Sequence, residues 1–225
     1  MPIINMVYKK KKWWKPWANT IAYYPLKADF NDASWNNKNL TNTWSPSITT
    51  YWWVACASYS SWNNYSYYNG SIWATATART ISVWLNIPTA LDAWIWWIAT
   101  SNNYWKWWLW FTEKSWQIWV SDFWAGQDRF AYPSWWFNII AAQEWSTIKA
   151  YLNWTLVKTY TNQDTTWSWA TAPNILKIWW KPWSNGGWAD SNFAWYVSEF
   201  ILENKTRTAD EATKYYNSTK SNYWL

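Results

Sequence analysis

The side chains best suited to hold a metal ion lie in two turn-rich segments. Asp29, Asn31 and Asp32 bring carboxylate and amide oxygens close together beside a turn, and Asp190 lies in a second loop. Ca²⁺ takes about six to eight oxygen ligands of this kind. These four residues therefore predict a calcium site. The alternative, which the sequence favours, is an Asx turn, where the carboxylates accept hydrogen bonds from nearby backbone amides.

Two loops combine planar rings with polar groups, as a glycan site requires. A sugar needs an apolar surface under its ring and hydrogen-bonding groups for its hydroxyls, and such sites are commonly carried by loops. The predicted ligand-binding residues are Asn102, Asn103 and Tyr104 in one loop, and Asp128, Arg129 and Tyr132 in the other. Ordinary polar loops are the alternative for each residue. Four further tyrosines form either a core-facing or a rim cluster: Tyr59, Tyr65, Tyr67 and Tyr68.

The sequence offers few combinations of side chains that could form an active site. The chain has no histidine, which excludes Ser-His-Asp and Cys-His pairs and His-ligated zinc. Cys56 is the only cysteine, so it forms no disulfide within the chain, and its apolar surroundings predict a buried thiol. Glu199 and Glu203 would lie about 13 Å apart in a strand, whereas glycosidase carboxylates lie about 5 to 9.5 Å apart. We therefore expect no enzyme.

Short strand signals recur along the chain with turn residues between them. This spacing predicts an all-β fold, a two-sheet antiparallel β-sandwich of the jelly-roll type. The predicted strands are 21–26, 40–43, 48–51, 54–58, 65–68, 79–87, 95–100, 109–112, 117–120, 137–142, 147–152, 156–161, 174–178 and 193–202.

Two of these strands and one helix carry clear patterns. Residues 79–87 alternate apolar and polar side chains, which predicts one face in a core. Residues 193–202 are apolar on both faces, with Glu199 on the side of Val197, and suit a central strand. Thr208 and Glu211 form a capping box that predicts one short C-terminal helix over about 209–217.

Tryptophan is unusually frequent and glycine unusually rare. The 225 residues include 32 tryptophans and 4 glycines, whereas an average chain has about 7% glycine. Asn153-Trp154 lies between two alternating runs, where a two-residue hairpin favours Asn-Gly because both positions need positive φ. Six doublets would place indoles on both faces of strands: 13–14, 52–53, 96–97, 107–108, 135–136 and 179–180.

This pattern predicts that most of the tryptophans are glycine in the native protein. The codon UGA is read as glycine in certain bacterial lineages and their viruses, and translation with another code would print tryptophan. Trp84, in mid-strand with no turn residue beside it, is expected to be genuine. The alternative is a Trp-rich chain with aromatic platforms for sugars or membranes, but one domain of this size cannot bury 32 indoles without large exposed apolar patches.

With glycines restored, the chain resembles the concanavalin A-like lectin/glucanase superfamily, in its laminin G-like branch. The resemblance covers about 22–216 and rests on ordered segments at 24–36, 80–85, 150–155, 177–179 and 193–216. It implies two facing antiparallel sheets that bind glycans or proteins, with calcium at the rim in some relatives. The Glu-x-Asp-x-x-Glu strand of glucanase members does not occur here.

The charge distribution indicates a leader and one domain. Five lysines lie within residues 9–15, and the other 14 of the 19 basic residues nearly balance 13 acidic ones, so we expect no nucleic-acid partner. Residues 1–19 are predicted to be a basic flexible leader and 20–225 the sandwich domain. There is no apolar run of 18 residues, which predicts no membrane span, and the first residues are too short for a signal peptide.

Together these observations predict a non-catalytic carbohydrate-binding or adhesion module. We expect it on a phage virion or a cell-surface appendage, binding a glycan or a cell-surface polysaccharide, with Ca²⁺ as its one candidate cofactor. The alternative is a structural or oligomerising virion protein without glycan affinity. A homo-oligomer is compatible with both.

Overall fold

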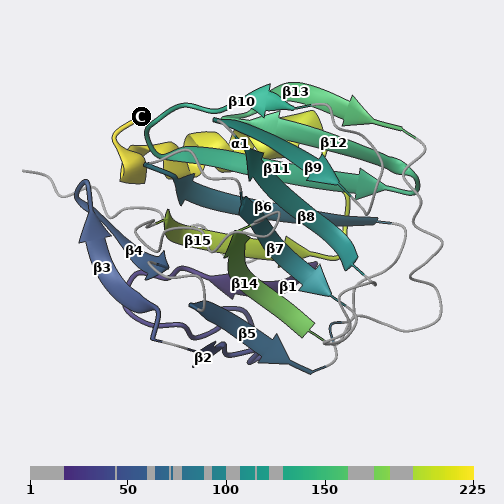
Figure 1. The fold of residues 1–225 in the computed structure, drawn as a ribbon. Coiled ribbons are helices and arrows are strands. Elements are labelled where there is room, and N and C mark those ends of the chain that lie inside the picture. Colours follow the sequence, from purple (N-terminus) through teal and green to yellow (C-terminus); the bar gives the residue numbers. More distant parts are fainter. Residues whose placement is uncertain are drawn as a thin grey trace, which may run out of the picture.

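The computed structural model forms two antiparallel sheets that face each other (Figure 1). It describes residues 18–43, 45–59, 64–70, 72, 78–88, 93–99, 107–114, 116–121, 129–161, 175–182 and 195–225. The predicted leader lies almost entirely outside these residues, and the first strand begins at Thr20. Within the described part of the chain, no helix is both long and apolar enough to cross a membrane.

Sheet A contains eight strands and has β6 and β15 at its centre. Its order is β13 (Thr155–Tyr160), β12 (Thr147–Leu152), β11 (Phe137–Glu144), β6 (Ala78–Asn86), β15 (Trp195–Glu203), β4 (Val54–Tyr59) and β3 (Ser47–Tyr51). β1 (Thr20–Tyr24) also pairs with β15, along residues 200–203, while β4 pairs along residues 195–197. The two strands therefore occupy successive parts of the same β15 edge.

Sheet B contains seven strands. Its order is β10 (Phe130–Ala131), β9 (Gln117–Ser121), β8 (Trp107–Lys114), β7 (Ala93–Ala99), β14 (Ile175–Pro182), β5 (Tyr65–Asn69) and β2 (Thr41–Thr43). β2 and β5 thus form one end of the sheet.

The all-β prediction is confirmed, and each of the fourteen predicted strands overlaps an observed one. The two-residue strand β10 was not predicted, because two residues cannot show an alternating pattern. The helix is also confirmed: α1 spans Ala209–Thr219 and is followed by the 3₁₀ turn η2 (Lys220–Tyr223). The Thr208 hydroxyl accepts from the Glu211 amide, and the Glu211 carboxylate accepts from the Thr208 amide.

Buried side chains form two cores, one on each face of sheet A. The main core lies between the sheets and includes Val83 and Leu85 of β6. The second core lies between sheet A and α1 and includes Trp84, Ile140 and Tyr215. The apolar face predicted for residues 79–87 lies in the main core, and the helix also covers the opposite face, which the alternation did not predict.

A bulge in β15 changes which side chains face each core. Its pairing with β6 shifts between Val197 and Glu199. Val197 and Phe200 belong to the main core, whereas Ile201 belongs to the core under the helix. The predicted alternation, which placed Glu199 on the side of Val197, was wrong because the extra residue of a bulge reverses the faces beyond it.

Tryptophans divide by location among the residues with described side chains. Trp84, Trp136 and Trp195 are buried, whereas eight others are exposed. Six of the exposed ones have positive φ: Trp52, Trp53, Trp116, Trp145, Trp154 and Trp224. Four of the tight turns between neighbouring strands thus contain a tryptophan in the left-handed region that favours glycine.

Candidate functional site

Asp32, one of the predicted calcium ligands, organises the loop after β1. Its Oδ1 accepts hydrogen bonds from the amides of Tyr23 and Ser34, both at 2.9 Å. Its Oδ2 accepts from the Ser34 hydroxyl at 2.8 Å and from the Lys38 amide at 2.9 Å. The buried carboxylate therefore has four donors, which hold the loop against β1.

Asp29 and Asn31 lie together on the exposed side of the same loop. The Asn31 amide donates to Asp29 Oδ1 at 3.0 Å, and the Asn31 side chain donates to Asp29 Oδ2 at 2.9 Å. These contacts and those of Asp32 have the geometry of the Asx-turn alternative. A cation at Asp32 would have to displace four donors, so the arrangement does not fit a calcium ion as it stands.

Asp190 lies outside the described residues, and calcium binding stays a prediction. No group of three or more acidic, cysteine or histidine side chains that could hold a metal occurs in the part of the chain that the structure describes.

The predicted glycan-binding loops are only partly described. Asn102, Asn103, Tyr104 and Asp128 lie outside the described residues. Arg129 is partly buried immediately before β10. Tyr132 is buried, and its ring centroid lies 5.1 Å from that of Phe137 in the main core. The ring of Tyr132 therefore contributes to packing, and the role of these loops in binding stays a prediction.

The four tyrosines near β5 separate into two pairs. Tyr59 is fully buried, and Tyr68 packs against the main core. Tyr65 and Tyr67 are partly exposed, and their ring centroids lie 5.6 Å apart. The sequence left a core-facing and a rim position open. Tyr59 and Tyr68 face the core, whereas Tyr65 and Tyr67 lie on the outer face of sheet B, because neighbouring positions of β5 point to opposite faces.

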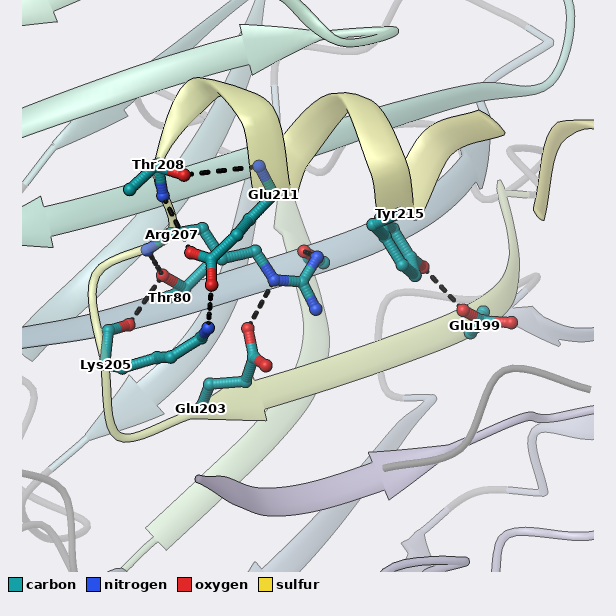
Figure 2. Close-up of polar contacts among 9 residues, drawn as sticks. Thr80, Glu199, Glu203, Lys205, Arg207, Thr208, Glu211 and Tyr215 are labelled. Atoms are coloured by element: carbon teal, nitrogen blue, oxygen red, sulfur yellow. Dashed lines mark hydrogen bonds and ion pairs between the residues drawn. The ribbon is translucent and has the colours of Figure 1, made fainter. Parts of the chain in front are cut away.

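Glu199 and Glu203 lie under the helix rather than in a shared cleft. The Tyr215 hydroxyl donates to Glu199 Oε1 at 2.5 Å, and the Tyr23 hydroxyl lies 3.5 Å from Oε2. Burial raises the pKa of the Glu199 carboxyl, and the hydrogen bond from Tyr215 and the charges of Lys27 and Arg207 oppose this shift only in part. Figure 2 shows Tyr215 reaching down from α1 to Glu199 on β15.

Glu203 forms a buried ion pair with Arg207. Arg207 Nε lies 2.5 Å from Glu203 Oε2, and both side chains are inaccessible to solvent. Arg207 Nη1 donates to the Ser82 hydroxyl at 2.8 Å, and the Arg207 amide donates to Thr80 Oγ1 at 2.9 Å. Burial raises the pKa of the Glu203 carboxyl, although the charge of Arg207 lowers it. The network in Figure 2 joins the end of β15 to α1 and β6, which is a structural role.

Cys56 is buried, as the sequence predicted. Its thiol lies 3.8 Å from the Thr49 carbonyl oxygen. Burial raises the pKa of the Cys56 thiol to about 12, so the thiolate that would act as a nucleophile is disfavoured at neutral pH.

Trp84, which the sequence predicts to be genuine, is fully buried. Its ring stacks on Tyr223 with centroids 3.8 Å apart, and its indole N–H donates to Thr219 Oγ1 at 3.2 Å. Trp136 is also buried, and its indole N–H donates to the Tyr51 carbonyl at 3.3 Å. The sequence did not single out Trp136, since a doublet gives no sign of which member is buried.

The fold is shared with toxin receptor-binding domains. No family model matches the chain, and no curated protein matches it. It is similar to a structure of botulinum neurotoxin type C described as interacting with two ganglioside molecules, at 14% identity and a TM-score of 0.69, over 89% of this chain and 51% of that one. It is equally similar to the binding domain of botulinum neurotoxin DC in complex with rat synaptotagmin II, at 14% identity and a TM-score of 0.69, over 89% and 52%.

The receptor-binding domain of the C/D mosaic serotype gives the same result, at 13% identity and a TM-score of 0.69, over 88% of this chain and 51% of that one. The chain thus spans about half the length of these structures. At this level of identity, the similarity shows a shared β-sandwich fold.

Proposed function

We propose that the protein is a non-catalytic carbohydrate-binding or adhesion module. The observation that carries this proposal is the shared fold, which covers 89% of the chain and occurs in a neurotoxin described as interacting with gangliosides. The positions of Glu199 and Glu203 support a non-catalytic role as well. Both carboxylates are buried against α1 with tyrosine and arginine partners, whereas a glycosidase needs its two carboxylates in one cleft. The ligand class would be a glycan or a cell-surface polysaccharide.

The proposed location is a phage virion or a cell-surface appendage. The support is the resemblance to laminin G-like modules, which are common in such appendages. The predicted loops at 102–104 and 128–132 would contribute to recognition, and Ca²⁺ remains a candidate cofactor at Asp29 and Asn31.

A glycan array tests the proposed function directly. The full chain would be applied to an array of ganglioside oligosaccharides and bacterial surface polysaccharides, in calcium and in EDTA. Saturable binding to a defined set of glycans is expected, and loss of binding in EDTA would support the calcium site. Absence of binding to every glycan up to millimolar concentrations would contradict the proposal and favour a structural or oligomerising role.

We further propose that the turn tryptophans are glycine in the native protein. Six exposed tryptophans adopt positive φ, a conformation that costs a side-chain-bearing residue about 1–2 kcal/mol and glycine almost nothing. Trp52 and Trp53 both adopt it, with φ of 48° and 64°, as the two central residues of a type I′ hairpin turn do. Trp84 and Trp136, by contrast, are buried with their indole N–H groups hydrogen-bonded.

Peptide mass spectrometry of protein from its natural source tests this assignment. Glycine is expected at residues 52, 53, 145 and 154, and tryptophan at 84 and 136. Tryptophan at the four turn positions, or UGG codons there in the gene, would contradict the proposal.

A further inference from the structure

The outer face of sheet B presents a small block of aromatic and hydroxyl groups at its β2–β5 end. Tyr65 and Tyr67 of β5 lie one strand away from Thr43 and Thr41 of β2, which are their direct pairing partners. All four side chains are at least partly exposed. We refer to these four residues as the Tyr-Thr block. Figure 1 shows β2 and β5 at the end of the sandwich opposite to α1.

The direction of these side chains follows from the residue between the tyrosines. Ser66 is buried and accepts a hydrogen bond at 2.9 Å from the hydroxyl of Tyr59, which lies in the main core. Ser66 therefore points between the sheets, and its neighbours Tyr65 and Tyr67 point away from them. Directly paired residues share a face, so Thr41 and Thr43 also lie on the outer side.

The block is held in place from the inside of the sandwich. Ser66 Oγ donates to Asn42 Oδ1 at 2.7 Å and thus fixes the central residue of β2 to β5. Together with the bond from Tyr59, this gives a chain of three polar groups from the core to the end of the sheet. A ligand would therefore meet a surface whose backbone is already ordered, which lowers the entropic cost of binding.

We infer that the Tyr-Thr block binds one face of a sugar ring. Two rings with centroids 5.6 Å apart and planes inclined by 43° offer apolar surface, and the threonine and tyrosine hydroxyls offer donors and acceptors beside it. The four residues are uncharged, and Lys177 of β14 pairs directly with Tyr67 on the other side of β5. This inference rests on the proposed function, because it identifies the surface through which the carbohydrate would bind.

The size of the block favours a sugar over a protein partner. Each tyrosine has about 150–250 Å² of surface in total, and both rings are already partly buried. A stable protein interface requires about 800 Å² from each partner, which four partly exposed side chains cannot supply. The block itself contains no tryptophan, although Trp179 of the neighbouring strand β14 pairs directly with Tyr65.

The test compares variants of the full chain on the tightest-binding glycan found with the array. A Tyr65→Thr/Tyr67→Thr double variant removes both rings and places β-branched residues, which favour strands, at the two positions. We expect its affinity to fall at least about tenfold, as loss of about 1.4 kcal/mol of aromatic contact implies. Tyr67→Phe, which retains the ring, should bind within about threefold of the original chain. Tyr51→Thr, the same change at a partly buried tyrosine of sheet A, is the matched control.

Thr41→Val provides a second, milder probe, because it removes one hydroxyl and preserves the shape of the side chain. A loss of about two- to tenfold is expected if that hydroxyl contacts the sugar. Unchanged affinity in both Thr41→Val and the folded double variant would overturn the inference while the proposed function stands, with binding located elsewhere. If the original chain binds no glycan, the inference and the proposed function fail together.

Discussion

The outer faces of the two sheets differ in what covers them. On sheet A, α1 lies over a second core that contains Trp84, and the buried Glu203–Arg207 pair joins the helix segment to the end of β15. At the β5 end of sheet B, Tyr65 and Tyr67 remain partly exposed. The difference indicates that packing closes the helix side of sheet A, whereas the β5 end of sheet B keeps exposed side chains, which include the proposed sugar-binding block.

The largest expected effect comes from breaking the buried ion pair on sheet A. Arg207→Ala leaves the Glu203 carboxylate buried without its cation, which should lower the free energy of unfolding by about 3–5 kcal/mol. Urea denaturation at pH 7 would measure it. Lys205→Ala, which removes a partly exposed partner of Glu211, is the control and should cost less than about 1 kcal/mol. Equal effects of the two variants would contradict a structural role for the buried pair.

The contribution of Glu199 to stability should fall as pH rises. Burial raises its pKa in the folded state above 4.5, so the folded protein retains this proton more strongly than the unfolded chain does. The contribution is present below about pH 4.5 and is lost as pH rises through the folded-state pKa, with a slope of at most about 1.4 kcal/mol per pH unit for one proton. Urea denaturation between pH 4 and 8 would show it.

Glu199→Gln should flatten this pH dependence, although Glu203, whose pKa is also raised, keeps part of it. Glu144→Gln changes an exposed residue at the end of β11 and serves as the control. A Glu199→Gln curve parallel to that of the original chain would argue against burial of a titrating carboxyl under the helix.

Exposed tryptophans with positive φ in the turns should contribute no stability. Trp53 is 83% exposed with φ of 64°, so Trp53→Gly should raise the free energy of unfolding by about 1–2 kcal/mol. Trp84→Gly should instead lower it, since the side chain is fully buried. Thermal unfolding of both variants would measure this contrast, and destabilisation by Trp53→Gly would count against the glycine assignment.

The smallest expected effect lies on sheet B. Tyr67→Thr removes a partly exposed ring and should change the free energy of unfolding by less than about 0.5 kcal/mol. A loss above about 2 kcal/mol in urea denaturation would mean that this face is packed as tightly as sheet A, and the contrast between the two faces would disappear.

Local patterns in the sequence predicted most of the fold. Alternation located the strands, and the Thr208–Glu211 capping box located the helix, because both signals lie within a few neighbouring residues. The bulge after Val197 left no such signal, since it depends on how β15 pairs with β6. The sequence also did not predict that α1 packs over Trp84, because this contact joins residues more than 100 positions apart in the chain.

The candidate site was harder to predict than the fold. The calcium and Asx-turn alternatives for Asp32 use the same residues, and only the four observed donors distinguish their geometries. The ring of Tyr132 packs in the main core, which ring and hydroxyl composition alone did not show, and its ligand-binding role stays a prediction. Conversely, alternation along β5 predicts that Tyr65 and Tyr67 point to one face of the sheet and Ser66 to the other. The alternation alone does not show which face is buried.

The pairing of β1 with β15 has a kinetic consequence. Residues 20–24 form their ladder with residues 200–203, so this part of sheet A cannot assemble until residues 200–203 have left the ribosome. The pairing joins segments that lie far apart in the sequence, and such non-local contacts slow the folding of β-sandwiches to about milliseconds to seconds. Refolding should therefore be slow, with the first and last strands joining late.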